Sequence, residues 1–349
     1  MEEMSSLDGL LSNVSVVGGN MQCYNIQNDE GISAEFMSTI MVMSQNVIMF
    51  AALMMPGFLL GKTKRFERVS VTTITNILMC VGMPFLVLSK LMEMDVYTLA
   101  ISELLCCIGL SIGIVLVLVV VCKYICPQKE IFREFSFCSA FSNCGFIGIP
   151  LAAAVFPEQP KVAVFVSLFN VFTSFMLWTF GVYILTGDKK NISAKKAICN
   201  PVTVSIVLGT IFSLIGCVQK LGFICNYSSM LAGITTPISM LVIGYEFSSI
   251  RFREVFTRKS SYLVSLVKLV ICPLIITAVL VVLGMFVEFS REFQEAMFIA
   301  TAVPTAATAS AMAEKYGADG KLSAEYTVVN TAFSVISLPL MYMIFHIII

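Results

Sequence analysis

The chain has 349 residues, of which 58% are apolar and only 13% are charged, and its mean hydropathy is +0.90. A soluble domain is typically about half apolar and about a quarter charged, so this composition indicates a membrane protein. The net charge is zero and His346 is the single histidine, which excludes a basic nucleic-acid surface and argues against a histidine metal site or a Ser-His-Asp triad. The twelve cysteines contain no CxxC pair. We therefore expect no metal, no cofactor and no enzymatic activity.

Ten apolar segments can be read as membrane-spanning helices, since a helix needs about 20 apolar residues to cross the hydrocarbon core. The fourth and ninth segments are the weakest, because they carry Gly, Pro, Ser, Thr or Asn where a lipid-facing helix would carry Leu; without them the count is eight. The ten lie near 36–61, 70–89, 98–122, 134–156, 161–186, 198–219, 228–249, 261–287, 293–314 and 322–349.

The distribution of basic residues favours ten spans over eight. Cytoplasmic loops carry the excess of Lys and Arg. With ten spans, one set of alternate loops holds 17 basic residues and the other set only four, namely Lys90, Lys161, Lys220 and Arg291. Without the fourth and ninth spans this contrast fades. The pattern predicts that both termini lie on the non-cytoplasmic side, the 188–196 loop in the cytoplasm and the 220–227 loop outside.

The two halves of the chain resemble each other. Pro84 and Pro150 are 66 residues apart, and Pro237 and Pro304 are 67 apart. A [Ser/Thr]-x-x-Asn-x-x-x-Ser pattern occurs in the fifth span at 167–174 and in the tenth at 327–334. Because each half has an odd number of spans, the second must be inverted in the membrane. We therefore predict an all-α polytopic protein with a 5+5 inverted repeat, as found in secondary transporters. Its parts are an acidic non-cytoplasmic extension (1–35), the first repeat (36–187), a short cytoplasmic linker (188–197) and the second repeat (198–349).

The fourth and ninth spans are predicted to be broken helices. Gly145, Gly148 and Pro150 interrupt the fourth, and Pro304 interrupts the ninth. Unwound backbone in the membrane survives only where protein or water satisfies its polar groups. The N-termini of half-helices carry a partial positive charge, which suits a carboxylate substrate. The alternative is an ordinary proline kink, which we expect for Pro84, Pro237, Pro273 and Pro339.

These residues resemble the motifs of the auxin efflux carrier family, which belongs to the superfamily of bile acid, arsenite and riboflavin transporters. The segment Asn143-Cys-Gly-Phe-Ile-Gly-Ile-Pro150-Leu151 is similar to its first crossover motif, Asn200-Pro201 to its second landmark, and 304–317 with 323–331 to its C-terminal segment. The resemblance implies crossed broken helices, a scaffold and a transport domain, often a homodimer, and transport of small organic anions such as auxin-like weak acids or dicarboxylates.

Some positions depart from the family pattern. Ser142 stands where many relatives have Gly, and Val202 where plant members have a second Asn. Only about ten residues join the fifth and sixth spans, whereas many plant carriers have a long cytoplasmic loop there. A plant-type auxin substrate is therefore not expected, and the chain looks more like the compact microbial members.

The resemblance and the helix breaks together give a candidate substrate site near the middle of the membrane. Lys268, inside the eighth span, either attracts the anion or snorkels to the interface beside Glu246, and Glu103 is expected to be interfacial. The candidate substrate-binding residues are Asn143, Cys144, Gly145, Gly148, Pro150, Asn200, Pro201, Lys268, Pro304 and Thr305.

Coupling to an ion stays open at this stage. Asn170 with Thr173, or Asn330 with Thr331, could bind sodium or simply bond across helices. No acidic residue lies in either crossover, which disfavours proton exchange through mid-membrane aspartates. The leading hypothesis is a plasma-membrane carrier for a small organic anion that works by alternating access, coupled to Na⁺, to H⁺ or to neither. The alternatives are a sodium-coupled symporter similar to the bile acid carriers and a membrane sensor that keeps the transporter fold.

Overall fold

The computed structural model describes residues 26–63, 68–93, 96–188, 201–214, 222–248 and 257–349, and within these ranges it forms helices and no strands. Contacts divide the chain into a unit that ends at Met43 and a second unit that begins at Ser44. Of the first unit the structure describes the beginning of helix α2 (Ile26–Lys62), and all packing described below belongs to the second.

Within the described residues, seven helical stretches are long and apolar enough to cross a membrane. Each stretch coincides with one of the expected spans. The stretch that matches the seventh expected span (228–249) begins at Gly222, six residues before the expected start. The stretches are α2; α3 (Arg68–Ile77), η1 (Leu78–Gly82) and α4 (Met83–Met92); α5 (Ile101–Ile125); α8 (Pro160–Met176), η5 (Leu177–Gly181) and α9 (Val182–Thr186); α12 (Gly222–Ala232) and α13 (Thr235–Ser248); α15 (Lys259–Leu266), η8 (Val267–Ile271) and α16 (Cys272–Gly284); and α19 (Gly320–Ile348).

The other three expected spans contain shorter helices. The fourth consists of α6 (Phe132–Ala140), η4 (Cys144–Gly148) and α7 (Ile149–Val155). The described part of the sixth is α11 (Pro201–Leu214), and the ninth is split into α17 (Arg291–Ala302) and α18 (Ala309–Lys315). The structure is thus that of a helical, polytopic membrane protein. The ten-span inverted repeat remains a prediction.

Two prolines that were expected to kink their helices follow π-helical turns. Pro84 is the second residue of α4, which follows η1, and Pro273 is the second residue of α16, which follows η8. A proline has no backbone N–H and removes a helical hydrogen bond, and the wider π-turn accommodates that loss. Pro339 lies inside α19, which continues past it to Ile348. These three prolines lie in helices that continue past them, whereas Pro237 is the third residue of α13, after the interruption between Ala232 and Thr235. A kink at these prolines stays a prediction.

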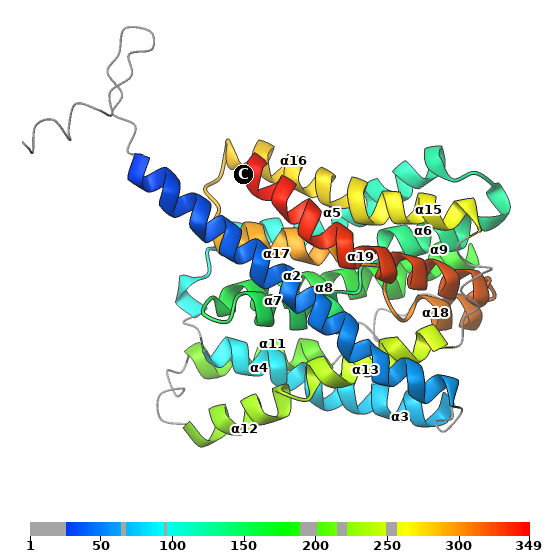
Figure 1. Cartoon of the computed structure of the whole chain (residues 1–349), viewed down its shortest axis with the longest axis horizontal. Coiled ribbons are helices and arrows are strands. Elements are labelled where there is room, and N and C mark those ends of the chain that lie inside the picture. The colour runs from blue at the N-terminus through cyan, green and yellow to red at the C-terminus, as the bar shows by residue number, and fades with distance from the viewer. Residues whose placement is uncertain (1–25, 64–67, 94–95, 189–200, 215–221, 249–256) are drawn as a thin grey trace, which may run out of the picture. The chain divides into compact units, whose positions relative to one another are not determined.

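The helices of the second unit pack in two groups. In one, α4 packs against α11 and α12, and these three helices lie side by side at the bottom of Figure 1. In the other, α8 contacts α5 and α17, while α19 contacts α15 and α18. The groups meet where α4 contacts α8. Helix α13, which contacts α3 and η1 next to the first group, also contacts η4, which packs against α8 and α17 of the second. Residues 144–148 of the first broken helix therefore lie at the boundary between the groups.

Helices α2 and α13 touch through small residues. A β-carbon added at Gly57 would lie 2.0 Å from the carbonyl oxygen of Leu241, and one added at Gly244 would lie 1.9 Å from that of Met54. Gly61 faces Ser248 in the same way. Close approach of backbones at Gly and Ser is typical of helix packing in membranes, where van der Waals contact drives association.

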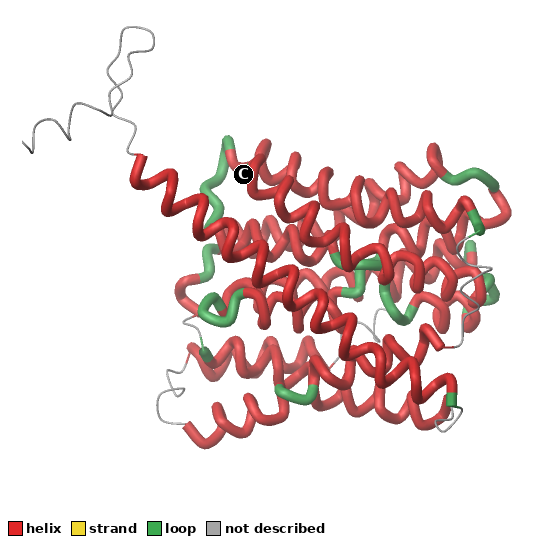
Figure 2. The backbone as a smooth tube through the Cα atoms, in the orientation of Figure 1, coloured by secondary structure: helices red, strands yellow, loops and turns green. Residues whose placement is uncertain are grey.

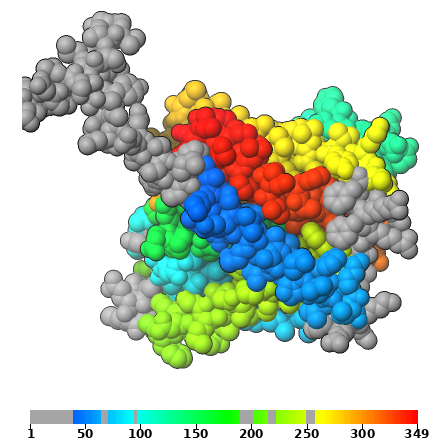
Figure 3. Space-filling model, in the orientation of Figure 1, coloured from blue at the N-terminus to red at the C-terminus, as the bar shows by residue number. Residues whose placement is uncertain are grey.

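Large apolar side chains cover much of the outer surface. Phe223 and Met230 on α12 and Ile336 and Ile347 on α19 are each more than 70% exposed. Parts of α12 and α19 form the surface seen in Figure 3, coloured yellow-green and red. Water would disfavour such a surface, whereas lipid accommodates it.

Candidate functional site

Two interrupted helices meet inside the second unit. Helix α6 ends at Ala140 and η4 begins at Cys144, while α17 ends at Ala302 and α18 begins at Ala309. Short loop segments interrupt the helices there (Figure 2). Ser142 and Thr305 form an isolated antiparallel bridge. In it, Asn143 N donates to the carbonyl oxygen of Pro304 at 2.7 Å, and Ala306 N donates to that of Phe141 at 2.9 Å.

The first break lies earlier than the Gly-x-Pro motif suggested. Gly145 and Gly148 form a π-helical turn, and Pro150 lies in the first turn of α7 without breaking it. The residues outside the helices are Phe141–Asn143 instead. The break in the second half therefore lies where it was expected, whereas the break in the first half lies before the expected position. Asn143 lies in this first break and does not share a helical face with Pro150. Some of the backbone groups that the breaks leave without a helical partner hydrogen-bond to each other across the bridge. These groups therefore need no water-filled cavity to satisfy them.

The side chains at the crossing satisfy further backbone groups. Asn143 accepts a hydrogen bond from Phe146 N at 3.3 Å through Oδ1 and so caps η4. Thr305 Oγ1 donates to the carbonyl oxygen of Cys138 at 2.6 Å, near the end of α6. Cys144 Sγ donates to the carbonyl oxygen of Ala300 at 3.1 Å, near the end of α17. Each break is thus tied to the helix of the other half.

Lys268 reaches this crossing from η8. Its side chain is fully buried, and Nζ donates to Ser142 Oγ at 2.5 Å and to the carbonyl oxygen of Thr301 at 3.0 Å. The third contact is with Cys272 Sγ at 3.8 Å. The snorkelling alternative is wrong, because the ammonium lies inside the helix bundle, and Lys268 makes no ion pair with Glu246.

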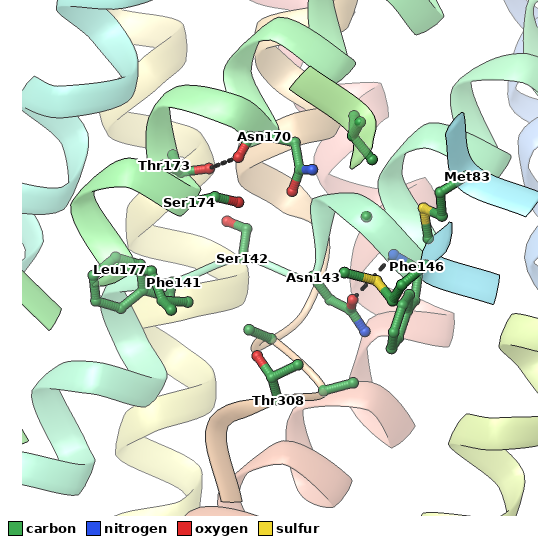
Figure 4. Close-up of a pocket in the computed structure, with 15 residues that line it drawn as sticks. Met83, Phe141, Ser142, Asn143, Phe146, Asn170, Thr173, Ser174, Leu177 and Thr308 are labelled. Carbon is green, nitrogen blue, oxygen red and sulfur yellow. Dashed lines mark hydrogen bonds between the residues drawn. The ribbon is translucent and has the colours of Figure 1, made fainter. Parts of the chain in front are cut away.

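A cavity of about 600 Å³, including the part open to solvent, lies beside the crossing. Polar side chains of α8 and of both breaks face it together with apolar ones of α4 and α11. Figure 4 shows Asn170, Thr173 and Ser174 on one side of the opening and Thr308 on the other, with Ser142 and Asn143 between them. The lining comprises Met79, Met83, Phe141, Ser142, Asn143, Gly145, Phe146, Asn170, Thr173, Ser174, Leu177, Val202, Ala306, Ala307 and Thr308.

A second, smaller cavity of about 340 Å³ also borders the crossing. Asn143 and Ala307 line both cavities. The second one adds Glu246 from α13 together with Thr327 and Thr331 from α19. The threonines come from the second copy of the repeated polar pattern, just as Asn170 and Ser174 come from the first.

The candidate residues take different places. Asn143, Gly145 and Asn170 line the larger cavity, and Thr331 lines the smaller one. Asn330 is fully buried, and its amide has no protein partner among the described residues. Asn200 lies outside the described residues. The other candidates line neither of these two cavities, namely Cys144, Gly148, Pro150, Pro201, Lys268, Pro304 and Thr305.

One further expectation needs correction. The 220–227 segment is not a loop throughout, because Gly222 to Tyr227 form the first part of α12. Asn226, in the sequon Asn226-Tyr-Ser, therefore lies on a helix. Glu103, which was expected to be interfacial, lies in the first turn of α5; it is buried, and its carboxylate accepts a hydrogen bond from Ser290 N at 2.7 Å, just before α17. Its place relative to the membrane interface stays a prediction.

Sequence reasoning missed several residues of the site and its supports. Ser142 was noted only as a departure from the family pattern, yet it links Lys268 to the first break. Buried Glu134 accepts from Asp319 N at 2.7 Å, and buried Glu295 binds Arg291 and Tyr342. Glu134 lies in the first turn of α6, and Glu295 is the fifth residue of α17. An acidic residue a few positions before each break is the signal that could have identified them.

The comparisons agree with this architecture. A family model described as membrane transport protein matches residues 41–342. The chain belongs to the membrane transport protein family. The match confirms the resemblance to auxin efflux carriers and covers both breaks and the second unit nearly to its end. None of the curated proteins compared with the chain matches it. As a member of this family the protein is a membrane transporter and not an enzyme.

Proposed function

We propose that this membrane transport protein is a secondary transporter for a small organic anion and that it works by alternating access. The observation that carries the proposal is the cavity beside the crossing, which polar side chains from both halves line and behind which Lys268 holds Ser142. Small-molecule sites are typically clefts with a mainly apolar lining and a few polar groups. The lining of this cavity fits that description.

The lining favours a substrate with an apolar body and a polar or anionic head. Methionines, phenylalanines and Leu177 offer apolar contact, while two asparagine amides and four hydroxyls offer hydrogen bonds. No Asp or Glu is among the lining residues, so a carboxylate meets no like charge there. The Lys268 ammonium lies one hydrogen bond behind Ser142 and adds a positive potential that falls off little in a dry interior.

The position of the cavity suits alternating access. Met83 and Val202 come from one helix group, while Asn143 and Asn170 come from the other. A relative movement of the groups would change the shape of the cavity and its opening. Transporter sites commonly lie at such boundaries, between discontinuous helices.

The test is transport by purified protein in proteoliposomes. A thermal-shift screen with mono- and dicarboxylic acids first selects compounds that raise the midpoint of unfolding, and uptake or counterflow of a labelled hit then measures transport. We expect saturable transport of at least one organic acid and none of neutral amide analogues. Stabilisation and transport by cations alone, with no response to any acid, would overturn the substrate class.

Sodium-coupled symport is the second candidate, and two observations favour it. The buried Asn330 amide has no protein partner among the described residues, and Glu246 lines the smaller cavity with Thr327 and Thr331. Oxygen ligands of this kind suit a hard cation. Replacing external Na⁺ by choline at constant ionic strength separates the candidates: a symporter loses transport, whereas an uncoupled or proton-coupled carrier retains it.

The remaining features of the proposal concern the membrane. We place both termini on the non-cytoplasmic side on the strength of the basic-residue distribution. The plasma membrane is proposed as the location. A homodimer is proposed from the family resemblance. Crosslinking in native membranes and labelling of single cysteines test the homodimer and the orientation of the termini separately.

A further inference from the structure

The ammonium group of Lys268 is buried among neutral acceptors. The side chain has no exposed surface, and all of its hydrogen bonds go to Ser142 Oγ, the carbonyl oxygen of Thr301 and Cys272 Sγ. No carboxylate among the described residues forms an ion pair with it. A buried charge costs several kcal/mol unless it is well compensated. The compensation at this position must therefore come from dipoles.

The acceptors match a cation in number and kind. An ammonium has three N–H donors and no acceptor, and three acceptor atoms lie within range. Thr301 belongs to the last turn of α17, which ends at Ala302, and Ser142 follows closely after the end of α6 at Ala140. Two helix C-termini thus point their negative dipole ends toward the crossing. A carbonyl oxygen, a hydroxyl oxygen and two dipole ends form a site for a monovalent cation.

We propose that the Lys268 ammonium is a tethered cation that occupies a built monovalent-cation site between the two helix breaks. The site holds Ser142 of the first break and Thr301 of α17 together, so the crossing stays assembled without a free ion. Replacement of Lys268 by a small residue removes the ammonium group and leaves an empty site that Na⁺ or a small ammonium ion can fill. Lys268 is on this account a positioning residue. The inference rests on the geometry of the crossing and not on the identity of the substrate.

The experiment measures the midpoint of thermal unfolding, Tm, of purified Lys268→Ala in choline, sodium, ammonium and methylammonium chloride at one ionic strength. In choline we expect Tm to fall by roughly 5 °C or more relative to wild type. Sodium, ammonium or methylammonium should then restore part of the loss saturably. Lys268→Met is the matched control, because its side chain fills the space and carries no charge, and it should show no restoration. Identical Tm values for Lys268→Ala in all four salts would overturn the inference.

A second measurement decides the question if Lys268→Ala yields no folded protein in any salt. Ser142→Ala is made in the wild type and in Lys268→Met, and the two losses of Tm are compared as a double-mutant cycle. We expect Ser142→Ala to lower Tm in the wild type and to have little effect in Lys268→Met, because the hydroxyl then has no ammonium to hold. Equal losses in both backgrounds would show that the ammonium does not organise the crossing.

Discussion

The backbone N–H of Asn143 donates to the carbonyl oxygen of Pro304 at 2.7 Å, and this bond joins the two interrupted helices directly. The bond uses only main-chain atoms, so it holds the crossing whatever side chain stands at position 143. The amide of Asn143 lines both cavities and caps η4. Substitutions at this position can therefore separate substrate binding from assembly of the crossing.

Asn143→Ala should abolish most transport at normal abundance in the membrane. The loss of a buried hydrogen-bond partner costs about 1–3 kcal/mol, or roughly ten- to hundredfold in affinity. Loss of the cap should lower stability by about 1 kcal/mol. Initial rates of uptake and the Kd of a bound acid measure the effect. Leu116→Ala, at an exposed position on α5, is the control and should transport normally.

Asn143→Asp refines this prediction. A carboxylate retains the cap oxygen for Phe146 N but places a negative charge on both cavities, so binding of an anion should fall further than in Asn143→Ala while Tm stays closer to wild type. Wild-type affinity and transport in both variants would rule out the substrate site at this position.

Gly145→Ala should narrow the larger cavity. The added methyl group would point between Met83 Cε, at 3.6 Å, and Asn170 Oδ1, at 3.8 Å, without a clash. We expect normal folding with a several-fold higher KM for the bulkier substrates and a smaller change for the smallest. Gly148→Ala meets Val166 and Cys144 in ordinary contact away from the cavity and should change KM little. Similar KM changes in both variants would contradict the assignment of the cavity.

Gly244→Ala and Gly57→Ala should each weaken the packing of α2 against α13. The new methyl groups would overlap backbone carbonyl oxygens, which only a separation of the helices can relieve. A lower Tm and a lower yield of folded protein are expected. Gly109→Ala on α5 meets nothing within 4 Å and should leave Tm unchanged or slightly higher. A wild-type Tm for Gly244→Ala would disprove the close approach.

Arg291→Leu should destabilise the protein by about 1–3 kcal/mol. Arg291 Nε lies 3.0 Å from Glu295 Oε1, and the glutamate is buried, so the variant leaves a buried carboxylate with Tyr342 as its remaining partner. Urea or thermal unfolding in detergent measures the change. The pair Lys90–Glu93 provides the comparison, since Glu93 is 43% exposed and such pairs contribute little. Lys90→Gln should therefore change stability by less than about 1 kcal/mol.

The orientation in the membrane is testable with single cysteines in a cysteine-free background. Impermeant thiol reagents should label a cysteine at Lys220 from outside and one at Lys189 only after permeabilisation. Labelling of position 220 only from the cytoplasmic side would reject the predicted orientation.

Much of the fold was predictable because lipid imposes a simple rule on helices. The seven long apolar helices follow from hydropathy alone, since each must satisfy its backbone internally over about 20 residues. The break at Pro304 was predictable from the missing N–H of proline. The break at Phe141–Asn143 was not predictable from the sequence, because nothing in Phe-Ser-Asn forbids a helix. The bridge to Thr305 and the hydrogen bond to Pro304 stabilise the non-helical conformation of this segment.

The site was predictable in part for a similar reason. Asn143 and Lys268 stood out because polar and charged residues are rare in apolar helices. The partner of Lys268 did not stand out, because a serine in a membrane helix is common and Ser142 is 126 residues away in the chain. The role of Glu295 depends in the same way on Tyr342 of another helix. Residue type predicts which groups need a partner, whereas the fold decides which partner they find.

Asn143 and Ala307 line both cavities, so the cavities adjoin at these two residues, and this proximity has an electrical consequence. Where both cavities hold water and open to opposite sides of the membrane, the membrane potential falls mainly across the residues between them and not across the whole thickness of the bilayer. One elementary charge moved through 100 mV gains or loses about 2.3 kcal/mol. An anion that passes from one side of Asn143 to the other would then travel only a few ångströms yet cross most of the field, so its transport rate would depend steeply on voltage.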